Sequence, residues 1–260
     1  MRIDLRLGTV TPIDPADARR IWRAFRADQG WSPIAPLLTP PSANFKLGKD
    51  TGIASYGVSL APHRISGTNV CPWSTPSCRA NCVAFSGNGR YDSVTAARVL
   101  KNRFLLAHPD AFYSLVGFEI DKATVLHGPD LRVRLNTFSD IAHENVAPWL
   151  LENRPGVRFY DYTKGWDRNP PDNYRLTLSA SERTTVEEIK TAVGNGRNVA
   201  VVFPQSSVTP LPETWQGLRV IDGDKTDNRA DDPTGVVVGL RAKGSMRNER
   251  KGMVKQWEYA

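Results

Sequence analysis

The chain has 260 residues, a formal net charge of +7 and three cysteines. A chain of this length can form one large α/β domain that needs no disulfide bonds, and an odd cysteine count argues against a secreted disulfide framework. No apolar leader follows Met1 and no run of eighteen apolar residues occurs, so we expect a protein of the reducing cytoplasm with no membrane association. The positive charge weakly favours an anionic partner such as a nucleotide or nucleic acid.

The first 43 residues are expected to form an N-terminal appendage. Residues 14–26 predict a helix, because an aspartate cap precedes a proline and Trp22 and Phe25 fall on one apolar face. Residues 31–41 are rich in proline, and we expect them to form a strap without regular structure.

Residues 44–260 are expected to form one domain in which strands and helices alternate. Seven runs rich in β-branched and aromatic residues predict strands, at residues 53–60, 132–135, 157–160, 174–178, 198–203, 218–221 and 236–240. Helices are predicted at residues 92–108, 109–121, 146–152 and 185–193. Most of the strands are continuously apolar, as is typical of parallel strands covered on both faces. We therefore predict an α/β fold, a partial (β/α) TIM-like barrel of six or seven mostly parallel strands.

Polar or ionisable residues follow nearly every predicted strand. They are Asn136, Ser139, Asp140, Asp161, Lys164, Ser179, Ser181, Gln205, Asp222 and Asp224. Parallel α/β folds place their binding sites at the carboxyl ends of the strands, so these residues are candidates for a common site. The alternative for each aspartate or serine is that it caps the next helix.

The three cysteines lie in one loop that follows the first predicted strand. Cys71, Cys78 and Cys82 have the spacing C-x6-C-x3-C, and Pro72 and Pro76 restrict the backbone between them. Such clustering favours metal or cluster binding over three unrelated buried thiols. Three thiolates can hold a [4Fe–4S] cluster and leave one iron open to a small molecule. Zinc is the alternative, because His63 could add the fourth ligand that a closed zinc site needs.

Two charged segments lie near the C-terminus. Residues 222–232 are rich in aspartate and could bind Mg²⁺ or Ca²⁺, but Lys225 and Arg229 could equally neutralise these acids in a solvated loop. We favour the solvated loop. Contact with a substrate is the alternative for its first two aspartates, Asp222 and Asp224. The basic tail, residues 241–255, is either a solvated face or a phosphate-binding one.

Three motifs carry a family resemblance. Asn44–Lys49, the cysteine loop with Tyr91 beyond it, and Phe159–Lys164 resemble an uncharacterised bacteriophage family of the "gene product eighty-eight" kind, over residues 44 to about 243. The βα pattern also resembles radical S-adenosylmethionine enzymes, although those mostly carry C-x3-C-x2-C.

The second resemblance implies a particular site. Cys71, Cys78 and Cys82 would hold a [4Fe–4S] cluster. The cofactor-binding candidates, in this case for S-adenosylmethionine, are Asn136, Ser139, Ser179 and Ser181, and the catalytic candidates are Asp140, Lys164, Asp222 and Asp224. The expected function is a bacteriophage iron–sulphur enzyme that acts by radical chemistry on a nucleotide or nucleic acid. The alternative is a non-catalytic, zinc-stabilised protein that binds nucleic acid or a host partner.

Overall fold

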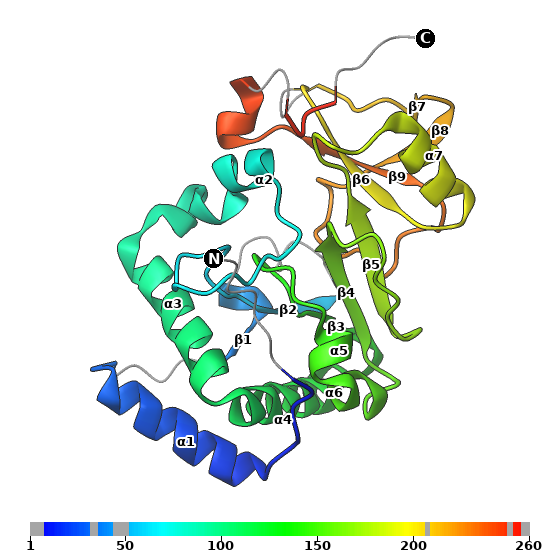
Figure 1. Cartoon of the computed structure of the whole chain (residues 1–260). Helices are drawn as coiled ribbons and strands as arrows, with labels where there is room; N and C mark the ends of the chain where they lie inside the picture. Colours follow the sequence, from blue (N-terminus) through cyan, green and yellow to red (C-terminus); the bar gives the residue numbers. More distant parts are fainter. Residues whose placement is uncertain (1–7, 32–35, 44–51, 206–208, 249–251, 256–260) are drawn as a thin grey trace.

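The computed structural model describes residues 8–31, 36–43, 52–205, 209–248 and 252–255 (Figure 1). Within these ranges the chain forms one mostly parallel sheet with helices packed around it. In the same ranges no helix is both long and apolar enough to cross a membrane.

Nine strands are present in the described part of the chain. They are β1 (Leu38–Thr39), β2 (Ala54–Val58), β3 (Leu131–Arg134), β4 (Arg158–Thr163), β5 (Tyr174–Ser179), β6 (Val199–Phe203), β7 (Thr214–Trp215), β8 (Leu218–Asp222) and β9 (Val237–Arg241). Their order is β1-β2-β3-β4-β5-β6-β9-β8-β7. The strands from β2 to β8 in this order are all parallel, and β1 and β7 pair antiparallel at the two edges. All seven predicted strands are therefore confirmed.

The mixed α/β class is confirmed, but the sheet does not close into a barrel. Strands β2 to β6 lie side by side in chain order, as a (β/α) barrel requires, whereas β9 lies between β6 and β8. Closure would need an outer parallel strand to pair back with β2. The free side of β2 is taken by β1 and that of β8 by β7, so the two short antiparallel strands end the sheet.

The strap is more ordered than its prolines predict. Leu38 and Thr39 form β1, which corrects the expectation that residues 31–41 lack regular structure. The reason is tertiary: the amides of Leu37 and Leu38 donate to the carboxylate of Glu119 at 3.3 and 2.7 Å. Both leucines are fully buried in the core of the sheet domain, so the N-terminal region packs as part of that core.

Helix α4 is the centre of the larger hydrophobic core. The helices are α1 (Pro15–Asp28), α2 (Pro76–Ala80), α3 (Asp92–Ala107), α4 (Pro109–His127), α5 (His143–Val146), α6 (Pro148–Glu152) and α7 (Val186–Gly194). Helix α4 packs between strands β1 and β3 on one side and helices α1 and α3 on the other. It runs six residues past its predicted end, to the point where Gly128 adopts a φ of 52° and Pro129 follows.

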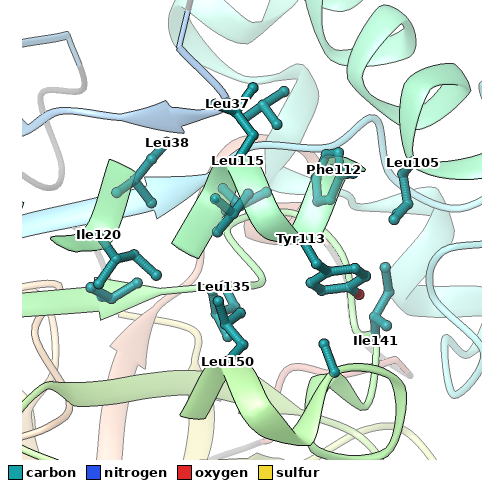
Figure 2. Close-up of a cluster of buried hydrophobic side chains, with 14 of the residues drawn as sticks. Leu37, Leu38, Leu105, Phe112, Tyr113, Leu115, Ile120, Leu135, Ile141 and Leu150 are labelled. Atoms are coloured by element: carbon teal, nitrogen blue, oxygen red, sulfur yellow. The ribbon is translucent and has the colours of Figure 1, made fainter. Parts of the chain in front are cut away.

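In the described residues, two large hydrophobic cores lie along the sheet, and a smaller cluster lies near the C-terminus. In the core around α4, Figure 2 shows Phe112, Tyr113 and Leu115 among leucine and isoleucine side chains from the strap and from the segments around β3. The second core joins α7 to β5, β6, β8 and β9. The parallel strands contribute side chains to these two cores, and their carboxyl ends form one edge on which the loops build a site.

Candidate functional site

The cysteine loop packs over the carboxyl ends of the parallel strands. All three cysteines line one cavity of about 240 Å³ at this edge, together with residues that follow β3, β4 and β5. The predicted site residues in this cavity are Asn136, Ser139, Asp140, Lys164 and Ser179. The fold thus brings the cysteines together with five of the eight other candidates.

A second cavity of about 240 Å³ adjoins the first. Lys164 and Ser179 line both cavities, and the second continues toward β9, where it reaches Asp224. A third and larger cavity, of about 760 Å³, is also lined by Lys164 and Ser179, and it includes Ser181. Lys164 and Ser179 therefore lie where the three cavities meet.

A short helix fixes the position of Cys78. Thr75 caps α2 and its hydroxyl accepts the Cys78 amide at 3.3 Å. Pro76 occupies the first turn, where its missing N–H costs nothing. Glu182 then ties this loop to the segment after β5, since it accepts the Thr75 hydroxyl at 2.7 Å and the Ser77 amide at 3.1 Å.

Cys71 is the most buried of the three thiols. Its sulfur accepts the amide of His63 at 3.2 Å, and its thiol donates to the carbonyl of Phe138 at 3.6 Å. Burial raises the pKa of Cys71 to about 12, and the nearby Cys78 and Cys82 raise it further. The thiol is thus protonated at neutral pH in the metal-free protein, and a metal ion that binds it would displace the proton.

Cys82 lies in a mixed electrostatic environment. Burial raises its pKa, and the amide of Ala84 and the cations of Arg98 and Lys164 oppose that rise. Arg98 donates to the carbonyl of Ala84 at 2.8 Å and lies over the ring of Phe138 at 4.1 Å, so its position is fixed. Cations and amide donors around thiolates stabilise their negative charge.

The site holds the kinds of chemical group that a three-thiolate centre needs, although the described side chains, as placed, do not form one. The three sulfurs face one cavity, the site offers amide donors, and Arg98 and Lys164 supply positive charge. In the ranges that the structure describes, no three or more His, Cys, Asp or Glu side chains stand close enough, as placed, to hold a metal ion.

Asn136 and Ser139 are held by their own neighbours. The Asn136 side-chain oxygen accepts the Ser139 hydroxyl at 2.7 Å and the Ile141 amide at 2.8 Å. The backbone amide of Asn136 donates to the carboxylate of Asp161 at 2.8 Å. These bonds shape the loop after β3, so the two residues form part of the wall of the cavity. The Asn136 side chain has little bonding capacity left for a cofactor, whereas the Ser139 oxygen can still accept a hydrogen bond.

Asp140 is buried in the wall of the cysteine cavity. It accepts the Lys164 amide at 2.9 Å and forms an ion pair with Arg168 at 3.2 Å. Burial raises the pKa of Asp140, and these two partners oppose the rise. This carboxylate connects the loops after β3 and β4 through the backbone amide of Lys164, a residue that also lines the cavity.

The remaining candidates are placed differently. Asp222 forms two bonds to Arg241 at 2.9 and 3.0 Å, and it lines none of the three cavities. Asp224 lines the second cavity, where it pairs with Lys243 at 2.5 Å. The Ser181 hydroxyl lies 3.2 Å from that of Thr184 in a local turn.

The sequence reasoning missed several residues of the site. Arg134 and Tyr162 line the first two cavities, and the guanidinium lies 5.1 Å from the centre of the tyrosine ring. Met246 and Met253, from the basic tail, line the same cavities and pack beside Cys78. A signal was available for the methionines, since apolar residues in a charged tail indicate packing, and for Tyr162, which lies in the family motif Phe159–Lys164.

The comparisons with known proteins identify the family. A model of the family described as Gene product 88 matches residues 37–256. The chain belongs to the Gene product 88 family. This confirms the resemblance to the bacteriophage family that the motifs indicate, although the first motif, Asn44–Lys49, lies outside the described residues.

No curated protein and no solved structure matches the chain. The likeness to radical S-adenosylmethionine enzymes stays a prediction from the sequence.

Proposed function

We propose that this Gene product 88 protein is an iron–sulphur enzyme of the reducing cytoplasm, built on half of a (β/α) barrel. Cys71, Cys78 and Cys82 would hold a [4Fe–4S] cluster at the carboxyl edge of the sheet. The observation that carries the proposal is the convergence of these three thiols on one cavity beside the strand ends. The chain-order arrangement of the parallel strands β2 to β6 supports the half barrel.

A cluster held by three thiolates leaves one iron open, to which the amine and carboxylate of S-adenosylmethionine could bind for radical chemistry on a nucleotide or nucleic acid. The protein's own residues would orient the reactants and limit water. Val83, Met246 and Met253 line both small cavities and give them apolar walls. Lys164, at the junction of the cavities, supplies a cation to a carboxylate or phosphate bound there.

The measurement that tests this proposal is the metal content of protein purified without oxygen. We expect a brown protein with about four iron atoms and matching acid-labile sulfide per chain. A colourless protein with one zinc per chain would exclude the cluster.

Zinc remains a second candidate because of the placement of His63. This residue lines the cysteine cavity, and its amide donates to the Cys71 sulfur. Burial lowers the pKa of His63, and Arg79 and Arg64 lower it further, so the imidazole is neutral at pH 7 and able to bind a metal. In that case the cysteine loop would be a structural zinc site in a non-catalytic protein. Replacement of His63 by Ala would then release the zinc, whereas a cluster held by three cysteines would survive it.

A further inference from the structure

The largest cavity at this edge lies between the cysteine loop and the segments that follow β4 and β5. We call it the basic groove. Its volume is about 760 Å³, and it is lined by His63, Arg64, Asn69, Pro72, Trp73, Ser74, Thr75, Arg79, Lys164, Trp166, Ser179, Ser181, Arg183, Thr184 and Glu188. Five of these residues, among them Lys164, also line the cysteine cavity, so the groove leads to it.

The groove carries a strong excess of positive charge. Its cations are Arg64, Arg79, Arg183 and Lys164, and none of them forms an ion pair within the described residues. Among the described residues of the lining, the one carboxylate is that of Glu188, which is engaged by Thr185 in the capping box of α7. Arg79 donates to the carbonyl of Ser74 at 2.7 Å. Cations that have no carboxylate partner favour an anionic ligand.

Two tryptophans line the same groove, and both are anchored. The indole of Trp73 packs on Gly165, where a Cβ atom would lie 2.8 Å from the ring, so only glycine permits this contact. The indole N–H of Trp166 donates to the carbonyl of Ser179 at 3.4 Å. Half-buried indoles in fixed positions offer flat surfaces on which a base can stack, and stacking combined with arginine contacts is how proteins bind single-stranded nucleic acid.

We propose that the basic groove binds nucleotide units through base stacking on Trp73 and phosphate contacts to Arg64, Arg79 and Arg183. This inference rests on the proposed function, because a nucleotide bound in the basic groove would reach the cysteine cavity past Lys164. The same chemistry is present in a single-stranded nucleic acid and in a free nucleotide, and the experiment separates these sources.

The test is fluorescence anisotropy with a labelled single-stranded oligonucleotide of mixed sequence, competed by unlabelled oligonucleotide, by duplex DNA or by a mononucleotide. Replacement of Trp73 by Leu should weaken binding about five- to a hundred-fold, because a base loses its stacking surface. Trp73→Phe should retain most of the affinity, since it keeps an aromatic face. Arg64→Ala and Arg183→Ala should each weaken binding and each reduce the slope of log affinity against log salt by about 0.7.

Arg23→Ala is the matched control, because it removes the same charge from an exposed position on α1. Competition by the oligonucleotide alone would identify a nucleic acid as the source, and competition by the mononucleotide would identify a free nucleotide. The inference is wrong if no nucleotide probe binds, if duplex DNA competes best, or if Arg23→Ala weakens binding as much as the groove variants do. Metal analysis of the same sample separates the two proposals: binding without iron contradicts only the enzyme, and iron without binding contradicts only the groove.

Discussion

The cysteine loop and the acidic loop both concentrate ionisable side chains, but the structure gives these side chains different partners. In the acidic loop, residues 222–232, the carboxylates are matched to arginines or a lysine. These pairs are Asp222 and Asp224 with Arg241, Asp224 with Lys243, Asp227 with Arg134, Asp231 with Arg132 and Arg158, and Asp232 with Arg229.

The region around the cysteine loop is different. Its three thiols and the side chain of Lys164 face cavities, and Arg64 and Arg183 form no ion pair in the described part of the chain. A group whose charge is balanced by a neighbour mainly stabilises the fold, whereas groups directed into a shared cavity are available to a ligand. The number of ionisable residues in a stretch of sequence does not distinguish these two cases. The partners of those residues in the folded chain do.

The largest expected effect is the loss of the metal centre. Replacement of Cys71, Cys78 or Cys82 by Ala should remove nearly all bound iron, because a cluster with two protein thiolates is poorly held. Ser74→Ala is the control, since Ser74 lines the same cavity without being a candidate ligand. Iron and sulfide assays would check this, and a full cluster in the Cys78 variant would remove that residue from the ligand set.

The acidic loop should respond in stability and leave the metal unchanged. Asp231→Asn weakens two bonds, at 2.8 and 3.1 Å, to the buried Arg132, so we expect a loss of about 2 kcal/mol in the free energy of unfolding. The more exposed aspartate of the Asp121–Arg154 pair gives a control, and Asp121→Asn should cost less. Urea denaturation measures both, and loss of iron from Asp231→Asn would show that the two regions are not independent.

The free energy of unfolding should decrease in acid because of His143, which is buried behind Asn136 in the wall of the cysteine cavity. Burial lowers the pKa of this histidine to about 3, with a further contribution from Arg168. Folding therefore favours the neutral ring. The stabilisation is fully present above the pKa of the unfolded-state histidine, about 6.5, and it is lost as the pH falls below this value, at up to about 1.4 kcal/mol per pH unit.

In His143→Gln this part of the acid sensitivity should disappear between pH 6.5 and pH 5. His127→Gln is the matched control. The His143 ring lies 3.0 Å from the Tyr113 hydroxyl and the His127 ring lies 3.0 Å from the Tyr56 hydroxyl, but His127 is only half-buried. Unfolding free energies at the two pH values check the prediction, and an unchanged slope in His143→Gln would contradict it.

The smallest effect is expected at Asp222. In Asp222→Asn, Arg241 retains Asp224 at 3.2 Å, so the loss of stability should be about 1 kcal/mol. Iron content and oligonucleotide binding should be unchanged, because Asp222 lines none of the three cavities. A large loss of either with the fold intact would return Asp222 to the list of functional residues.

Much of the fold could be predicted because its signals are local. The seven parallel strands are short runs rich in β-branched and aromatic residues, and Asp14 and Thr185 cap the helices that they precede. The open sheet could not be predicted, since it depends on the two short strands β1 and β7, which pair with the free sides of β2 and β8. Strand β1 was missed because its order depends on Glu119, some eighty residues away in the chain.

The site could be predicted only in part. The cysteines and Lys164 were identified because clustered thiols and strand-end positions are visible in the sequence. The engagement of Asn136 by Ser139, and of Asp222 by Arg241, depends on distances that only the folded chain sets. Arg134 gave no signal, because it reads as an ordinary strand residue, and Tyr162 was visible only as part of the family motif Phe159–Lys164.

The most direct test of the central claim is X-ray absorption at the iron and zinc edges of protein purified without oxygen. We expect an iron edge with sulfur neighbours and a short iron–iron distance in the wild type, and the loss of both in the three cysteine variants. Zinc bound by sulfur and nitrogen, with no iron, would contradict the proposal that these cysteines hold an iron–sulphur cluster.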